Sequence, residues 1–236
     1  TIIPQFRRCI DIGSNNACNA IHYAERFEWV ECFEPTHLAQ KLWQKTIQAN
    51  GVENATLHTD ALGEDDRVTK MITHPQNGGH NHLWHYDKNP RAQEQNLGRA
   101  THQVSQTTLD AYHFDHVDFV KIDVEGYEIF VVKGALQTIQ KHRPILQLEI
   151  VANQCRKFDY RAEDIVELFR TLDYRVLSKR DGWLDGVFTS SCRSDSTKGI
   201  YHNGVKRRGE MDLFFVPQEH NTNAYGNTFG ELFDIH

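Results

Sequence analysis

The chain has 236 residues, of which 39% are hydrophobic and 25% are charged, a balance typical of a globular protein with a sizeable core. No apolar run approaches the ~20 residues that a membrane span needs, and Thr1–Arg8 lacks the apolar region of a signal peptide. The formal net charge of −6 disfavours generic nucleic-acid binding. The five cysteines form no CxxC pair, so we expect reduced cytoplasmic thiols rather than a disulfide scaffold or a structural zinc site.

Short apolar runs alternate with helical patterns over the first 62 residues. Turn residues such as Gly13 and Pro35 end the strands, and apolar side chains recur at helical spacing between them. In chain order, the pattern predicts a strand at Arg8–Ile12, a helix at Asn16–Phe27, a strand at Trp29–Phe33, a helix from the capping residue Thr36 to Asn50, and a strand at Thr56–Leu62. This βαβαβ order is typical of a doubly wound parallel sheet.

The second half of the chain continues this alternation. The predicted elements are a central strand at 117–123, a helix at 129–139, a strand at 145–150, a helix at 161–172, and strands at 174–177 and 212–216. No helical pattern lies between the last two strands, so they are expected to be an antiparallel pair.

Two polar stretches interrupt the alternation. Thr73–Ser105 carries five histidines, and Asp181–Glu210 is rich in glycine, serine and charged residues. Loops of this length within a compact domain are usually functional or disordered. We therefore expect one domain over residues 1–236, with a His-rich insertion at 73–105 and a polar loop at 181–210.

The turn after the first predicted strand has the features of a nucleoside-binding site. Gly13 lets the backbone approach a ligand closely, and Asn15 tolerates unusual backbone angles and offers its amide. Glu34 ends the second predicted strand, 21 positions after Gly13, where a carboxylate can accept both hydroxyl hydrogens of an adenosyl ribose. A glycine after a strand is common, but its combination with Glu34 and the βαβαβ order favours a nucleoside-type cofactor.

The residues of this turn discriminate between two such cofactors. A dinucleotide requires a G-x-G-x-x-G turn that cradles its pyrophosphate, whereas Asn15 and Cys18 occupy the second and third glycine positions here. S-adenosylmethionine (SAM) carries no phosphate, and its cationic sulfonium and amino groups prefer nearby carboxylates and carbonyls. Asp11 and the acidic end of the strand at 117–123 meet that preference, so SAM is favoured.

Several segments together resemble the FkbM-type family of SAM-dependent methyltransferases, over about residues 9–150. The segments are Ile10–Asn15, Cys32–Pro35, Asp60–Gly63, Thr108–Asp110, the most specific string Val120–Glu128, Lys133–Ala135 and Leu148–Glu149. The resemblance implies an α/β fold with a doubly wound, Rossmann-like, seven-stranded methyltransferase sheet whose last strand is antiparallel, in agreement with the pair expected above. It also implies methyl transfer to a hydroxyl of a small molecule or glycan.

The resemblance further implies where SAM would bind. Its methionine part would contact Asp11, Gly13, Ser14 and Asn15, its ribose would contact Glu34, and its adenine would lie between Asp60 and Ala61. The family's glycine loop usually closes with a second glycine, but Ala17 stands there, so we expect a slight adjustment of the loop. Two structural alternatives stay open, because Asp60 could cap a turn and Glu34 could be a surface carboxylate.

Acidic residues crowd the end of the strand at 117–123. Glu125 and Glu128 can be explained by the favourable interaction of carboxylates with a helix N-terminus. Lys121 needs another explanation, because an unpaired lysine is rarely tolerated in an apolar central strand and a buried ion pair adds little stability. We therefore predict that Lys121, Asp123 and Glu149 form a polar cluster kept for catalysis.

Two catalytic arrangements fit these residues. In the first, which we favour, Asp123 or a lid histidine such as His80 takes the acceptor proton directly. In the second, Asp123, Glu149 and Asn153 hold a Mg²⁺-like ion. Lys121 would repel such a cation, so no metal site is expected.

The leading hypothesis is a cytoplasmic SAM-dependent O-methyltransferase. Its acceptor would be a small molecule or glycan, not a nucleic acid or a membrane, and an oligomer is allowed. An anionic acceptor is suggested by the basic residues of the polar loop, which are Arg193, Lys198, Lys206, Arg207 and Arg208. The alternatives are an NAD-type oxidoreductase and a non-catalytic domain of the same fold.

Overall fold

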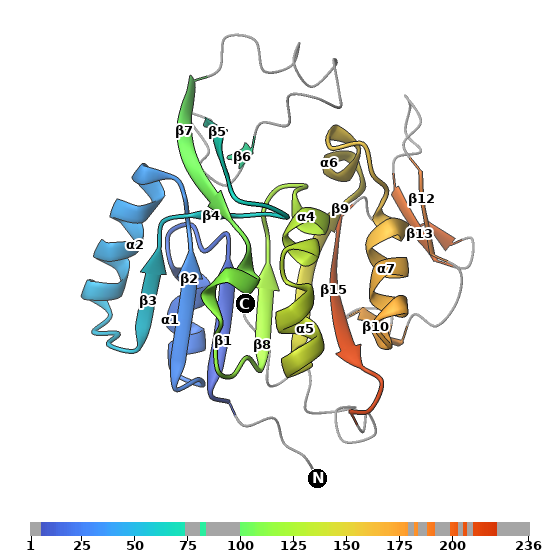
Figure 1. Ribbon diagram of the computed structural model, residues 1–236, viewed down its shortest axis with the longest axis horizontal. Coiled ribbons are helices and arrows are strands. Elements are labelled where there is room, and N and C mark those ends of the chain that lie inside the picture. The colour runs from blue at the N-terminus through green and yellow to red at the C-terminus, as the bar shows by residue number, and fades with distance from the viewer. Residues whose placement is uncertain are drawn as a thin grey trace.

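The computed structural model describes residues 6–73, 81–83, 100–178, 182–183, 188–191, 199–202, 205–206 and 210–220 (Figure 1). Within these residues, no helix is long and apolar enough to cross a membrane.

A mostly parallel sheet forms the centre of the fold. Its strands are β1 (Arg8–Ile12), β2 (Trp29–Phe33), β3 (Ala55–His58), β8 (Phe119–Ile122), β9 (Ile145–Val151), β10 (Tyr174–Ser178), β11 (Gly182–Trp183) and β15 (Glu210–Pro217), in the spatial order β11-β10-β15-β9-β8-β1-β2-β3. From β3 to β9 all neighbours are parallel, whereas β15 is antiparallel to both β9 and β10. The predicted seven-stranded α/β sheet with an antiparallel last strand is therefore confirmed, and β11 extends it by a short edge strand.

Helices cover both faces of this sheet. They are α1 (Cys18–Ala24), α2 (His37–Ala49), α4 (Glu128–Lys133), α5 (Leu136–His142), α6 (Ala152–Lys157) and α7 (Ala162–Thr171), with a 3₁₀ turn η2 (Leu109–Tyr112) before β8. Alternation along β1 separates two cores, because successive side chains of a strand point to opposite faces. Ile10 and Ile12 pack with the apolar residues of α4, α5 and α7, whereas Cys9 packs with those of α1 and α2.

Two further sheets include strands from the stretches expected to be polar insertions, and the first also takes in residues from before Thr73. The first has the order β4-β7-β5-β6 and consists of β4 (Ala61–Leu62), β5 (Arg67–Thr73), β6 (His82–Leu83) and β7 (Ala100–Thr107); Figure 1 shows it beyond the carboxyl ends of β1, β2 and β8. The second consists of β12 (Phe188–Ser191), β13 (Gly199–His202) and β14 (Val205–Lys206). The described parts of 73–105 and 181–210 thus contain strands rather than loop alone.

The prediction of one strand over 56–62 is wrong. β3 ends at His58, and the chain then leaves the main sheet at Asp60. Ala61 and Leu62 pair in parallel with Gln106 and Thr107 of β7 instead. The apolar run therefore belongs to two sheets. The pattern of side chains does not show where the chain leaves one sheet and enters the other.

The helix predicted over 129–139 is two helices that meet at Gly134. The carbonyl of Gly134 accepts the backbone N–H of Asp110 at 3.0 Å and so leaves the helical ladder. The Asp110 carboxylate in turn accepts the N–H groups of Gln137 at 3.0 Å and Thr138 at 2.7 Å, which caps the start of α5. A contact from a distant segment thus decides the break.

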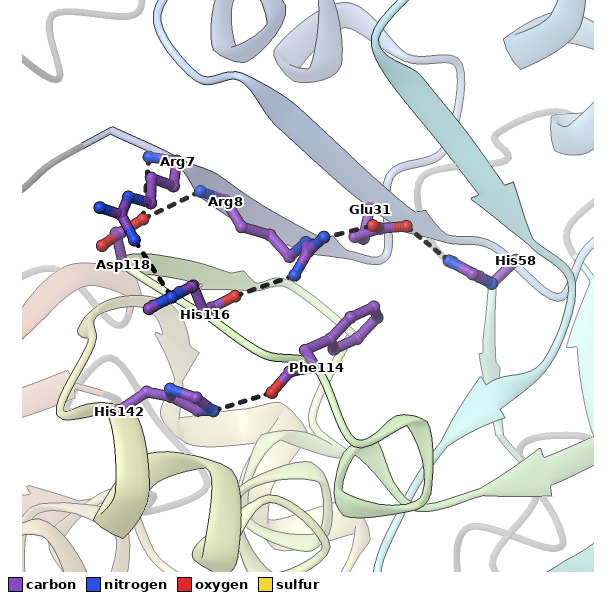
Figure 2. Close-up of polar contacts among 8 residues, drawn as sticks. All are labelled: Arg7, Arg8, Glu31, His58, Phe114, His116, Asp118 and His142. Atoms are coloured by element: carbon purple, nitrogen blue, oxygen red, sulfur yellow. Dashed lines mark hydrogen bonds and ion pairs between the residues drawn. The ribbon is translucent and has the colours of Figure 1, made fainter.

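A polar network crosses the first strands of the main sheet (Figure 2). Asp118, just before β8, accepts the backbone N–H groups of Arg7 and Arg8, both at 2.9 Å. The Arg8 guanidinium lies 3.3 Å from the Glu31 carboxylate, whose other oxygen is 2.8 Å from His58 Nε2. These contacts link neighbouring strands of the sheet, and those of Arg7, Arg8 and Asp118 lie at the amino-terminal ends of β1 and β8.

Candidate active site

A cavity of about 210 Å³ lies at the carboxyl ends of the central strands. This is where open α/β sheets bind ligands. Its walls come from the turns after β1, β2, β3 and β8, and residues of β4, β5 and β6 close it from the small sheet. The lining residues used below are Gly13, Ser14, Asn15, Phe33, Glu34, Asp60, Ala61, Met71, His82, Leu83, Asp123, Val124 and Glu125.

The glycine turn after β1 connects the neighbouring strands. The backbone N–H groups of Gly13 and Ser14 both donate to the Phe33 carbonyl, at 2.9 and 3.1 Å. Gly13 has a φ of 84°, and a side chain there would overlap the carbonyl oxygen of Asp123. Only glycine fits this combination of backbone angle and close approach.

Ala17 closes the same turn with a φ of 71° and is completely buried. A left-handed conformation costs an L-residue about 1–2 kcal/mol. Ala17 therefore adopts a backbone conformation that glycine takes more easily, and the expected slight adjustment of the loop stays a prediction.

Glu34 joins the turns after β1 and β2. Its Oε2 accepts the backbone N–H of Asn15 at 3.1 Å, and its Oε1 accepts that of Thr36 at 2.7 Å. Burial raises the pKa of Glu34, while the hydrogen bonds from Thr36 and Asn15 oppose that rise. Each oxygen keeps lone-pair capacity on the cavity side. The open alternative of a surface carboxylate is therefore wrong, because the residue is only 7% exposed.

Asp60 is held by an aromatic residue that the sequence analysis did not single out. The Tyr112 hydroxyl, at the end of η2, donates to Asp60 Oδ2 at 3.1 Å. The Tyr112 ring packs edge-on against the Phe33 ring. The His58 ring stacks on the same Phe33 ring, with ring centroids 4.6 Å apart. Asp60 thus has a fixed direction at the end of the cavity where Phe33 supplies an aromatic wall.

The predicted polar cluster is present beside β8. Lys121 is 8% exposed, and its Nζ lies 2.9 Å from Asp123 Oδ2. Asp11 is its register partner on β1, and the Glu149 carboxyl hydrogen-bonds the Asp123 side chain. Three carboxyl groups therefore lie around one ammonium group, and the hydrogen bond between Asp123 and Glu149 requires a proton on one of these two.

This arrangement sets the protonation of its members. Burial lowers the pKa of Lys121, but Asp123, Asp11 and Glu149 together outweigh burial and raise it above its usual value. Burial raises the pKa of Asp123, yet Lys121 outweighs it, so Asp123 titrates below its usual range. Burial raises the pKa of Asp11 to about 6, against the opposing effect of Lys121.

Comparison with known proteins decides the family. The FkbM methyltransferase domain matches residues 11–176, which is more than half of the chain. The chain belongs to the FkbM methyltransferase family. That match spans the glycine turn, Glu34, Asp60 and the whole polar cluster.

Individual relatives of the FkbM chain are distant. Methyltransferase 1 of the fungus Beauveria bassiana (strain ARSEF 2860) is 24% identical over 141 residues, which cover 53% of this chain and 57% of the relative. The crystal structure of methyltransferase FkbM from Methylobacillus flagellatus KT superposes with a TM-score of 0.52 at 17% identity, over 89% of this chain and 44% of that one. An rRNA methylase from Streptococcus thermophilus has a TM-score of 0.45 at 11% identity, over 92% and 90% of the two chains. The chain thus spans about half the length of the first two proteins.

The site of this FkbM-family chain fits a cationic, phosphate-free cofactor. Both carboxylate oxygens of Asp11 are buried and have no hydrogen-bond partner among the described residues. Lys121 is a nearby charge partner of Asp11, but the two oxygens have no hydrogen-bond donor in the part of the chain that the structure describes, and a buried carboxyl without one is costly. Asp11 lies behind the cavity wall that Gly13, Ser14 and Asn15 form, and SAM carries both a sulfonium and an ammonium group.

Other predicted residues fall outside this arrangement. His80 lies outside the described residues, as do Arg193, Lys198, Arg207 and Arg208, and the side chain of Lys206 is not described. His82, two positions after His80, does line the cavity and is 5% exposed. Among the described residues, no group of three or more His, Cys, Asp or Glu side chains is placed to hold a metal ion, and Asn153 is exposed on α6.

Proposed function

We propose that this FkbM-family chain transfers a methyl group from SAM to a hydroxyl of a small molecule or glycan. The observation that carries the proposal is the polarity of one cavity. Glu34 offers acceptors to a ribose at one wall, and the carboxyl-rich cluster around Asp123 offers negative charge at another.

We infer a partner for each part of the cofactor. Asp11, Gly13, Ser14 and Asn15 would hold the methionine part, since the last three line the cavity and the Asp11 carboxylate behind them accepts no hydrogen bond from the described residues. Glu34 holds the ribose, and Asp60 with Ala61 holds the adenine against Phe33.

Bound SAM would supply an activated methyl group, so the protein has to orient the acceptor oxygen and remove its proton. Asp123 lines the cavity as a carboxylate kept ionised by Lys121, and it can accept the hydrogen of the hydroxyl. Glu149 hydrogen-bonds Asp123 and helps to hold that carboxylate in place. Lys121 is thus a positioning residue, and Asp123 is the group that touches the acceptor.

The alternatives account for fewer of these observations. A dinucleotide would leave its pyrophosphate beside Asn15 and the Glu34 carboxylate, without the glycine cradle that phosphates need. A non-catalytic domain would be favoured by a filled pocket, whereas this pocket holds about 210 Å³. The expectation that nucleic acids are excluded rests on net charge alone. The acceptor is therefore sought in a screen of small hydroxyl compounds, glycans and RNA. A cytoplasmic location likewise stays an expectation.

Calorimetry tests the cofactor. The chain is titrated with SAM, with S-adenosylhomocysteine and with NAD under the same conditions. Binding of the first two without NAD supports the proposal. Binding of NAD alone would establish the oxidoreductase alternative, and no binding of any of them would favour the non-catalytic domain.

A further inference from the structure

The loop between β8 and α4, residues 123–127, forms part of the cavity wall and has an unfavourable backbone conformation. Asp123, Val124 and Glu125 line the cavity. Glu125 has a φ of 57° and Gly126 a φ of 104°, so two consecutive residues leave the ordinary backbone regions. A side chain at position 126 would also come within 2.8 Å of Gln154 in α6. Some other contact has to stabilise this conformation.

Glu128 supplies that contact from the first turn of α4. Its side chain is buried with 1% exposure. Oε1 accepts the backbone N–H of Gly126 at 2.9 Å and of Val124 at 3.3 Å. Oε2 lies 3.0 Å from the Tyr160 hydroxyl, which is also 2.9 Å from the Gly126 carbonyl oxygen.

The hydroxyl of Tyr160 cannot serve both of these oxygens. It has a single hydrogen, whereas a carboxylate oxygen and a carbonyl oxygen are both acceptors. With a proton on Glu128 Oε2, the carboxyl donates to Tyr160, and Tyr160 donates to the Gly126 carbonyl. The Cys155 thiol also hydrogen-bonds Tyr160 and can use the second lone pair of the phenol oxygen. In that arrangement every polar atom of the group is satisfied.

The surroundings of Glu128 favour its neutral form. The ionisable groups that face it are Asp123 in the same loop, Cys155 on α6 and Tyr160 before α7, and none of these three is a cation. Burial raises the pKa of Glu128 to about 7, Asp123 raises it further, and the hydrogen bonds from Gly126 and Tyr160 oppose the rise. Burial likewise raises the pKa of Cys155 to about 12, so the thiol stays protonated.

We propose that Glu128 is a positioning residue that works as a neutral acid. Its carboxyl donates a hydrogen bond to Tyr160, Tyr160 donates one to the Gly126 carbonyl, and this chain holds the 123–127 loop so that Asp123 faces the cavity. The role given to Asp123 rests on the proposed function, whereas the protonation of Glu128 does not. Ionisation of Glu128 removes the donor to Tyr160, draws the phenol hydrogen away from Gly126 and releases the loop.

Glu128→Gln tests the protonation directly. Its amide oxygen can accept from Gly126 and its NH₂ can donate to Tyr160, which reproduces the pattern of the protonated carboxyl and none of the charge. We expect the variant to fold. A carboxyl pKa raised from 4.5 to about 7 stabilises the fold fully below pH 4.5, and this stabilisation is lost as pH rises through 7. The ratio of the unfolding constants of parent and variant should thus change roughly a hundredfold between pH 4.5 and pH 8.

The matched control is Glu167→Gln, since Glu167 is 69% exposed on α7 and its pair with Arg170 is long at 3.6 Å. Its stability should follow that of the parent at every pH. Infrared difference spectra at pH 6 give a second measurement, because the protonated-carboxyl band should be stronger in the parent than in Glu128→Gln, with the contribution of Asp11 common to both. Parallel stability profiles of parent and Glu128→Gln, with protonated-carboxyl bands of equal strength, would overturn the proposal. These measurements need no SAM, so they stand even if calorimetry refutes the proposed function.

The positioning role is tested by kinetics with the acceptor that the screen identifies. Glu128→Gln should retain parental kcat at pH 6 and lose less kcat than the parent above pH 7. Tyr160→Phe should lower kcat at least tenfold with the Kd of SAM within about threefold of the parent. Glu128→Ala serves as the fully truncated variant. If Glu128→Gln is as inactive as Glu128→Ala at pH 6, the charge rather than the proton is required, and the proposal is overturned.

Discussion

The carboxylate of Glu34 accepts the backbone N–H of Asn15 at 3.1 Å and thereby ties the end of β2 to the glycine turn after β1. The same carboxylate also holds the turn at Thr36. A residue assigned to the ribose therefore also shapes the wall around it, and the two roles need separate measurements.

Glu34→Ala should weaken SAM binding at least about tenfold. The variant loses a charge-assisted, two-pronged contact of roughly 1.5–3 kcal/mol. Calorimetry with SAM measures the affinity, and denaturant unfolding shows whether the turns still hold. Glu53→Ala is the control, because it removes the same charge from an exposed position before β3. An unchanged affinity in a folded Glu34→Ala would remove Glu34 from the cofactor site.

Asp123→Asn should abolish methyl transfer while leaving SAM binding largely intact. Asparagine keeps the size of the side chain but cannot take the acceptor proton. Single-turnover assays with bound SAM measure the loss. Asp115→Asn is the matched substitution at an exposed position before β8, and it should retain parental activity. A near-parental rate for Asp123→Asn would make Asp123 structural.

Lys121→Met should destabilise the fold by about 3 kcal/mol at pH 7, because it leaves buried carboxylates without their cation. The paired state of Asp123 lowers its pKa below the usual 3.8, so that stabilisation is present above pH 4 and is lost as pH falls further. The gap between parent and variant should hence narrow on acidification. Lys133→Met, which removes an exposed pair with Glu64 at 3.6 Å, should cost under about 1 kcal/mol. Equal costs for both variants would contradict the cluster's proposed energetics.

Tyr112→Phe should reduce SAM affinity several-fold and stability by about 0.5–1.5 kcal/mol, because Asp60 loses the hydroxyl that fixes its direction. Tyr174→Phe provides the comparison. Its hydroxyl donates to the Pro144 carbonyl at 3.0 Å, and neither residue lines the cavity. It should therefore show the loss of stability without the loss of affinity. If both variants bind SAM like the parent, Asp60 needs no support from Tyr112.

The strand ends of this site could be predicted because polar residues after buried strands meet at one edge of a parallel sheet. Gly13, Glu34, Asp60 and Asp123 lie around one cavity for that reason. The polar cluster around Lys121 could be predicted as well, since a charge within an apolar strand needs partners.

Contacts that depend on distant segments could not be predicted in this way. Tyr112 reaches Asp60 across 52 positions, and Tyr160 reaches Glu128 across 32. Periodicity assigned Glu128 to the start of a helix, but only the packing of α6 and the chain before α7 turns its side chain inward. The break at Gly134 likewise depends on Asp110, which lies in another element.

The close approach of Gly134 to Gly63 sets a limit on how the cavity can open. Gly63 directly follows β4, and a side chain on Gly134 would overlap its carbonyl oxygen. The β4 edge of the small sheet is thus packed tightly against the junction of α4 and α5, so we expect it to move little. His82 and Leu83 of β6 sit on the opposite edge of that sheet and also line the cavity. We therefore expect the β4 edge to stay in place when an acceptor enters the cavity.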